Sequence, residues 1–341
     1  MDAKGSSPDG VHVDYRDFFA LGTYGPVDAS VGLALLRTEI EHSAQRGDKC
    51  FEQTLETLKS GCYEHFCLST VAFREVTRVY PLHQSNWHSG ERVPLQHAGE
   101  LGAESALLTC RGHYKAAYQK LREILELVAL QLYFYIAQDY SLVRAWGRAE
   151  ARTPPVRKML DSIAGDQRSS GIAVSFTLKD SITSIYDRLG AYVHTRGVPS
   201  TTMGLTGSNS ILFHEPALKR YCEFFEEVTH ASILLLAAFF PAAVIPLDAF
   251  RKLGHFDPGW LPRNDHVMSI RSVLSPIEVS ELETNASRNP WFLEVAKQLA
   301  ALPDLSLEEI EQTYQQFQAA VREGPESIQA LLKRTNALLE V

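Results

Sequence analysis

Arg188 and His194 are the two residues whose types and spacing in this chain could do chemistry. They lie in the stretch YDRLGAYVHTRG, residues 186–197, which has the periodicity of a helix. A histidine can take up and return a proton near neutral pH, and the planar guanidinium of an arginine binds phosphate oxygens in pairs. Together the two side chains suit acid–base chemistry on a phosphodiester.

The spacing of this pair leaves two interpretations open. In a straight helix the two side chains point about 120° apart and are separated by about 9 Å along the axis. A bend near Gly190, or a two-fold dimer that brings two such pairs to one cleft, would let them act on the same phosphate. Alternatively, the stretch is an ordinary helix C-terminus, where the dipole favours cations and Gly197 is the expected residue beyond the end.

Four further residues are candidates for binding the substrate of such a site: Arg196, Tyr192, Arg157 and Lys158. The first also fits a simple helix-end cation, and the tyrosine also fits a core packing residue. Residues 144–168 carry six basic and three acidic side chains, whereas residues 276–327 carry ten acidic and three basic ones. The net charge of −8 argues against a protein that coats nucleic acid without specificity. A polyanion would therefore bind in the middle of the chain, unless the two stretches are only solvated helix faces.

Metal and cofactor chemistry have little support in the sequence. His83, His88 and His97 fall within twenty residues, but no carboxylate or cysteine accompanies them at ligand spacing. The stretch CYEHFC, residues 62–67, lacks the second half of a zinc site. The chain has no phosphate-binding loop of the Walker type, no GxGxxG after a strand and no GxSxG. We expect no metal and no cofactor.

Helical periodicity dominates the chain, and no strand alternation exceeds four residues, so we expect an all-α fold. The predicted helices cover 28–46, one or two segments within 50–80, about 103–139, 152–163, 176–194, 215–240, 275–288, 290–302 and 306–336. The predicted irregular segments are 81–100, 195–210 and 251–265. Ser306 and Glu309 have the spacing of a capping box.

The chain of 341 residues divides by composition into four parts. We expect a loose segment over 1–26, helices and a connecting loop over 27–100, a helical bundle over 101–249, and an acidic helical region over 250–341. The apolar run at 231–247 contains two prolines, which favours a buried core helix over a membrane span. Five cysteines, an odd number at low density, favour free thiols and a cytoplasmic protein.

Over roughly residues 103–245 the chain resembles the HEPN superfamily of small helical bundles. The resemblance rests on Arg188-x5-His194, which fits the family's signature of an arginine and a histidine four to six residues apart, and on the preceding stretches RGHYKAAYQKLREILELVALQLYF and TPPVRKMLDSI. It implies a HEPN-like bundle with additional N-terminal and C-terminal helices. Leu189 follows the arginine, where many nucleases of the family have a polar residue.

The resemblance also implies a function. Catalytic members of the family are metal-independent ribonucleases of bacterial toxin and antiviral defence systems. His194 would then act as general acid and base, Arg188 would stabilise the transition state, and RNA and a second copy of the chain would be the partners. The alternative is a non-catalytic HEPN-like scaffold or interaction module that binds a regulatory protein, which the acidic C-terminal region favours.

Overall fold

The computed structural model describes residues 29–78, 92–168, 172, 176–194, 197–207, 211–254, 264–324, 326–327 and 330–331. Over these residues it contains fourteen α-helices and three short 3-10 helices, and no strand. The predicted all-α fold is therefore confirmed for the part of the chain that the structure describes.

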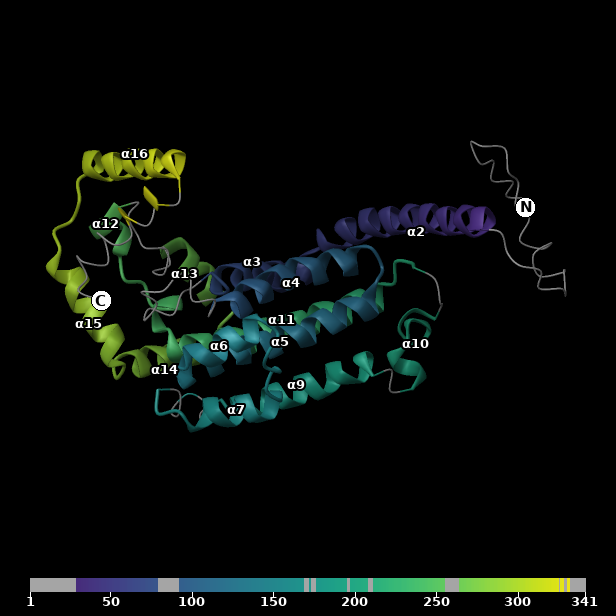
Figure 1. The fold of residues 1–341 in the computed structure, drawn as a ribbon, viewed down its shortest axis with the longest axis horizontal. Coiled ribbons are helices and arrows are strands. Elements are labelled where there is room, and N and C mark those ends of the chain that lie inside the picture. The colour runs from purple at the N-terminus through teal and green to yellow at the C-terminus, as the bar shows by residue number, and fades with distance from the viewer. Residues whose placement is uncertain are drawn as a thin grey trace.

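Six helices form three layers (Figure 1). The middle layer pairs two long helices, α5 and α11; α3 and α4 lie on one side of it, and α7 and α9 lie on the other. The bounds of these helices are Glu64–Val76 for α3, Val93–Cys110 for α4, Tyr114–Ala137 for α5, Val156–Gly165 for α7, Leu178–Val193 for α9 and Glu215–Phe239 for α11. Because α5 contacts four other helices of this bundle, it is the central support of the fold.

The main core is continuous and draws on residues from Tyr63 to Leu282. The second half of α11 is its most apolar part, and residues 231–244 are all buried. The apolar run at 231–247 forms the expected buried core helix up to Phe239, and then passes into a 3-10 turn at Pro241–Ala243. Among the described helices, none is long and apolar enough to cross a membrane.

The predicted single helix over 103–139 is wrong, because the chain breaks between α4 and α5. Gly112 has a φ of +80° there, in the left-handed region that side chains disfavour. A Cβ at this position would lie 3.0 Å from the Leu212 carbonyl oxygen, so the break is also a close backbone contact.

The predicted irregular segment 81–100 is wrong from residue 93 onward, where α4 begins; residues 79–91 lie outside the described part.

Three other predicted boundaries differ from the structure. The first described helix, α2, covers Ala29–Leu58 and so continues twelve residues beyond the predicted end at 46. The predicted polar loop 195–210 contains a 3-10 turn at Val198–Ser200 and the short helix α10, Thr202–Thr206. The segment 251–265 begins inside α12, Ala249–Leu253, and α13, Asn264–Arg271, begins before it ends.

The C-terminal helices lie close to their predicted positions. They are α14, Pro276–Ala286, α15, Pro290–Ala301, and α16, Leu307–Glu323. The predicted capping box of Ser306 and Glu309 is present, with both reciprocal hydrogen bonds. Helix α16 ends at Glu323, with Gly324 as its C-cap, rather than continuing to 336, and residues 332–341 lie outside the described part.

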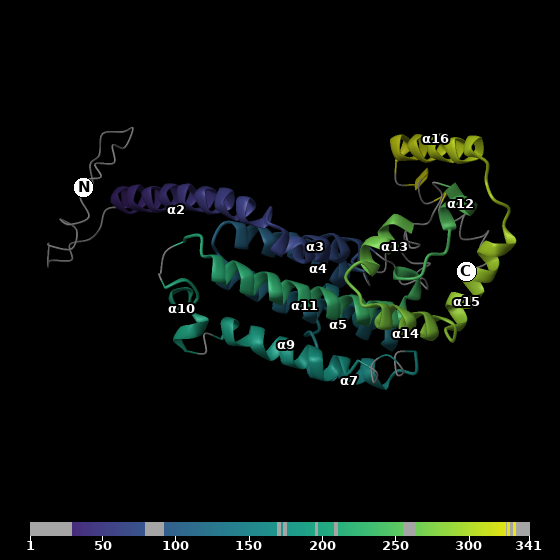
Figure 2. The ribbon, with the colours of Figure 1, turned by 180° about the vertical axis from the view of Figure 1, so that it is seen from behind.

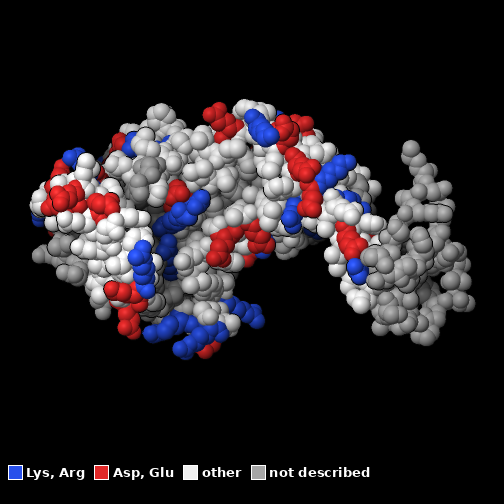
Figure 3. All heavy atoms as spheres, turned by 90° about the horizontal axis from the view of Figure 1, so that it is seen from above, with Lys and Arg blue, Asp and Glu red and all other residues white. Residues whose placement is uncertain are grey.

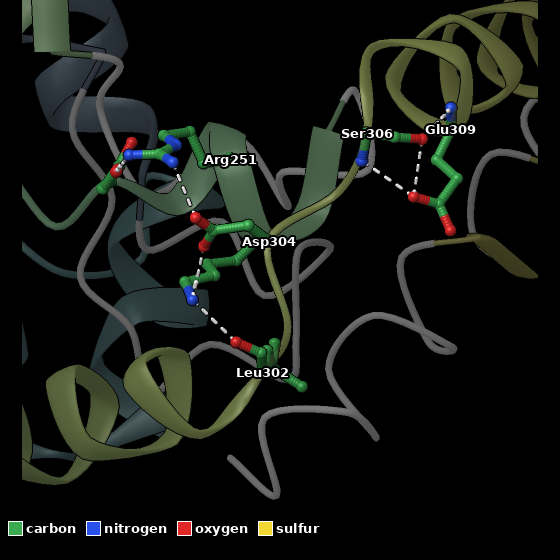
Figure 4. Close-up of polar contacts among 7 residues, drawn as sticks. Arg251, Leu302, Asp304, Ser306 and Glu309 are labelled. Carbon is green, nitrogen blue, oxygen red and sulfur yellow. Dashed lines mark hydrogen bonds and ion pairs between the residues drawn. The ribbon is translucent and has the colours of Figure 1, made fainter.

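A second, smaller core holds this region against the end of α11. Its members are Ala242, Ala249, Leu253, Ala286, Phe292, Val295 and Leu299. Asp304 reinforces it by pairing with two cations of α12: its carboxylate lies 2.6 Å from Arg251 and 2.6 Å from Lys252 (Figure 4). Lys252 also donates to the Leu302 carbonyl at 2.7 Å, so one short segment joins α12, α15 and α16.

The first half of α2 projects beyond the bundle. Figures 1 and 2 show its N-terminal end reaching past the ends of α4, α5 and α11, while its C-terminal half lies beside α4. The remaining described helix, α6 at Tyr140–Gly147, follows α5 after a left-handed residue at Gln138 and an Asp139 cap.

Candidate functional site

Helix α9 carries both residues of the predicted catalytic pair. Ile182, Ile185 and Leu189 recur at helical spacing on its buried face, which packs against α5 and α11. The helix is continuous through Gly190 and ends at Val193, and the His194 backbone N–H donates to the Gly190 carbonyl at 3.1 Å. The helix therefore does not unwind at Gly190 to bring the pair together within one chain.

Arg188 faces α11. Its guanidinium pairs with the carboxylate of Glu227 through both terminal nitrogens, one of them 3.2 Å from Oε1, and lies 4.9 Å from the centre of the Phe224 ring. The arginine side chain stays 47% exposed, so the pair is accessible to a competing anion.

His194 is exposed and faces α5. Its Nε2 lies 3.4 Å from Nη1 of Arg122. An arginine can only donate, so in this contact the imidazole accepts at Nε2, which requires the neutral ring with its proton on Nδ1. Arg188 and His194 thus lie at two different edges of α9, and the arginine that contacts the histidine comes from another helix.

Arg122 is held by a small network between α5 and α9. Its Nη2 donates to the Tyr186 hydroxyl, which donates in turn to Oε1 of Glu126 at 2.6 Å. The guanidinium also lies 4.2 Å from the centre of the Tyr186 ring and 3.7 Å from the Glu126 carboxylate. Only 16% of the arginine side chain is exposed, so its direction is fixed by the protein rather than by solvent.

The spacing of residues explains why this network forms. Arg122 and Glu126 are four residues apart on α5, and Tyr186, Gly190 and His194 follow at intervals of four on α9, so each set lines one helix face. A Cβ at Gly190 would lie 4.0 Å from Nε of Arg122, which leaves room for the guanidinium to cross the helix there. Burial, followed by the hydrogen bond to Glu126, raises the pKa of Tyr186.

The structure places the predicted substrate-binding residues as follows. Tyr192 is buried: its ring stacks on Tyr118 with centroids 4.3 Å apart and meets Phe224 edge-on. Arg157 and Lys158 are exposed on α7, and Arg157 forms an ion pair of 3.3 Å with Asp187 of α9. Arg196 lies outside the described residues.

Histidines and cysteines do not gather into a metal site within the described ranges, where no group of three or more potential ligands lies together. His97 is on α4, with its ring nitrogens 3.4 Å from Glu100 and 3.8 Å from Glu123. His83 and His88 lie outside these ranges. All five cysteines are free thiols, and Cys62 and Cys67 are exposed.

Sequence reasoning missed Arg122 and Glu126. A signal was present, because this charged pair stands at i, i+4 on either side of Ile124, where the apolar segment begins. The sequence could not supply the partner, since His194 is 72 residues away in the chain. Comparison of the chain with models of known families, with curated proteins and with solved structures finds no match.

Proposed function

We propose that this chain is a HEPN-like helical protein that cleaves RNA without a metal ion, with His194 as the group that moves the proton. The supporting observation is the contact between His194 and Arg122: an exposed imidazole lies 3.4 Å from a guanidinium whose direction is fixed by its neighbours. A cation beside a proton acceptor is the arrangement that cleavage of a phosphodiester needs.

The reaction is a transfer within the RNA strand. His194 takes the proton of a ribose 2′-hydroxyl at Nε2, and the 2′-oxygen forms a bond to the adjacent phosphorus. The bond from phosphorus to the 5′-oxygen breaks, and that oxygen takes up a proton from water to leave as a hydroxyl, while the proton held by His194 returns to water. The products are a 2′,3′-cyclic phosphate and a 5′-hydroxyl. Because Arg122 occupies Nε2 in the resting chain and is held in place by Tyr186 and Glu126, the exposed imidazole has to turn away from it before the base is free.

Arg188 stabilises the developing charge on the phosphate in this proposal, as the resemblance implies. Its exposed pair with Glu227 opens when a phosphate replaces the carboxylate. A dimer brings the arginine of one copy to the histidine of the other, because the two side chains occupy different edges of α9. Arg157, Lys158 and Arg196 hold the strand on either side, in an effector of the bacterial toxin or defence type.

The test is cleavage of total RNA or tRNA in EDTA by the purified full chain. We expect His194→Ala to lower the rate by at least about 100-fold and Arg188→Ala by a similar factor. His42→Ala, which removes an exposed histidine from α2, is the matched control and keeps full activity. Cleavage that survives unchanged in both of the first two variants places the activity elsewhere and ends this proposal.

A second candidate function is a non-catalytic HEPN-like module that binds a protein. It is favoured by the ion pairs of Arg188 with Glu227 and of Arg157 with Asp187, which neutralise two of the cations that RNA would need. Glu227→Gln separates the two candidates, because it frees Arg188. Tighter RNA binding by this variant supports the nuclease, whereas no RNA binding by either protein, together with a retained protein partner, supports the module.

A further inference from the structure

The projecting half of α2 exposes three large aliphatic side chains on one face. Leu33, Leu36 and Ile40 are 67%, 57% and 59% exposed, and their spacing of three and four residues places them on one line along the helix. Residues of this size are rarely left so open in a row, and a contiguous exposed apolar face indicates an interaction surface.

The same line continues into a face that the bundle covers. Seven residues after Ile40 the line reaches Gly47, and steps of three and four residues then lead to Cys50 and Thr54. These three residues are all buried. We call the whole line, from Leu33 to Thr54, the seam of α2. Thr54 donates to the Cys110 carbonyl at the end of α4, and a Cβ at Gly47 would lie 3.8 Å from Arg111. The seam thus carries small residues where α4 covers it and large aliphatic residues where α2 projects beyond the bundle.

We propose that the projecting halves of α2 from two copies of this chain pair antiparallel along this seam, with Leu33 of each copy packed against Leu36 of the other. The seam is self-complementary in this register, because the same two positions exchange across the two-fold axis. A parallel pair is excluded by shape: the bundle lies on the seam side of α2, so two parallel copies would place both bundles in the same space (Figure 1).

The charges beside the seam fit this register. The projecting half of α2 lies beside the grey segment in Figure 3. Acidic and basic side chains are mixed along it there, so neither sign of charge dominates. In the antiparallel register Arg37 lies opposite position 32 and Glu39 opposite position 30, which are a glycine and a serine. Neither of these two charges therefore meets a like charge directly opposite. The paired surface is small, so we expect a dimer that depends on protein concentration rather than an obligate one.

Sedimentation equilibrium and native mass measurements of the full chain, over a range of concentrations, test this proposal. We expect the wild-type chain to dimerise and Leu36→Glu or Leu33→Lys each to weaken dimerisation by more than about 100-fold, since each buries a charge against an apolar partner. Gln45→Glu, an exposed change on the opposite face of α2, is the control and leaves the dimer intact.

Mixing the two charged variants tests the register. In the antiparallel pair the glutamate introduced by Leu36→Glu meets the lysine introduced by Leu33→Lys. The unchanged Leu33 of the Leu36→Glu variant still meets the unchanged Leu36 of the Leu33→Lys variant. We therefore expect the mixture to form a heterodimer. A mixture that stays monomeric overturns the register. A wild-type chain that is monomeric at every concentration, as when residues 1–28 of the same copy cover the seam, overturns the whole proposal. A dimer that persists undiminished in both charged variants is held by a surface other than α2, such as the α9 pairing proposed for RNA cleavage, and it overturns the α2 pairing while leaving the proposed function standing.

Discussion

The guanidinium of Arg122 lies 3.4 Å from the imidazole of His194, although the two residues are 72 positions apart in the chain. Arg188 is on the same helix as the histidine, yet it turns toward Glu227 of α11. The packing of α9 between α5 and α11 therefore decides which arginine the histidine meets. A signature that is read along one helix does not contain this information.

Arg122 and Arg188 are expected to differ in their contribution to stability. Arg122→Gln removes a mostly buried guanidinium from Tyr186 and Glu126, so we expect it to lower the free energy of unfolding by about 1–3 kcal/mol. Arg188→Gln breaks an exposed ion pair and should cost at most about 1 kcal/mol. Urea unfolding of the two variants measures the difference, and equal losses would show that the α5–α9 network is not the stronger contact.

Buried tyrosines should make the fold sensitive to alkali. Burial raises the pKa of Tyr63 and of Tyr114 to about 12, and it also raises the pKa of Tyr118 and Tyr221. An unfolded tyrosine ionises near pH ~10, so above that value the unfolded chain loses protons that the folded chain keeps. The stabilisation is complete below this pH and falls as the pH rises toward the folded pKa, by up to about 1.4 kcal/mol per pH unit for each tyrosine.

Circular dichroism and tyrosinate absorbance, followed together during an alkaline titration, check this expectation. The absorbance of these tyrosines should rise with the loss of helix and not before it. Ionisation of the full set while the helices remain intact would contradict the burial that the structure assigns to them.

Two glycines in helices should respond oppositely to alanine. A Cβ at Gly102 of α4 would lie 2.7 Å from the ring of Phe73, so Gly102→Ala should destabilise the fold by about 1–3 kcal/mol. A Cβ at Gly190 of α9 meets only Arg122 at 4.0 Å, so Gly190→Ala should stabilise it by about 0.5–1 kcal/mol through helix propensity. Thermal unfolding of both variants gives the sign of each change, and a destabilised Gly190→Ala would show that α9 needs a flexible point there.

Protonation of Asp304 should loosen the C-terminal helices. The hydrogen bond from Lys252 is the main cause that lowers the pKa of this carboxyl, and Arg251 adds to it. Its stabilising effect is present above the usual aspartate pKa of about 3.9 and is lost as the pH falls through the lowered value. Asp304→Asn imitates the protonated state at neutral pH.

Hydrogen exchange across α16 measures this loosening, with α5 as the internal reference. We expect faster exchange in α16 for Asp304→Asn and no change for Glu311→Gln, which removes an exposed acid beyond the first turn of α16. Unchanged exchange in Asp304→Asn would mean that the small core around Phe292 holds this region without the ion pairs.

Local signals predict much of the fold. The recurrence of Ile182, Ile185 and Leu189 indicates α9, and the capping box of Ser306 and Glu309 indicates α16; both helices begin within two residues of the expected position. These signals act over one or two helical turns, which is why they can be read from a single sequence.

The break at Gly112 could not be predicted in the same way, because an isolated glycine is compatible with a helix and the close contact comes from Leu212, about 100 residues away. The site has the same limit: Arg122 is visible as a charged residue on a helix, but its proximity to His194 follows from the packing of α5 against α9. Long-range contacts decide both cases. The division of the chain into N-terminal, middle and C-terminal parts stays a prediction.

The projecting half of α2 and the surroundings of His194 lie on different parts of the bundle. The C-terminal half of α2 contacts the bundle at Cys110 and Arg111, whereas the surroundings of His194 depend on the opposite layer of the bundle. Substitutions of Leu33, Leu36 or Ile40 therefore leave the surroundings of His194 unchanged, and substitutions around His194 leave the projecting half of α2 unchanged. Each proposed role could then be inherited, lost or engineered without the other.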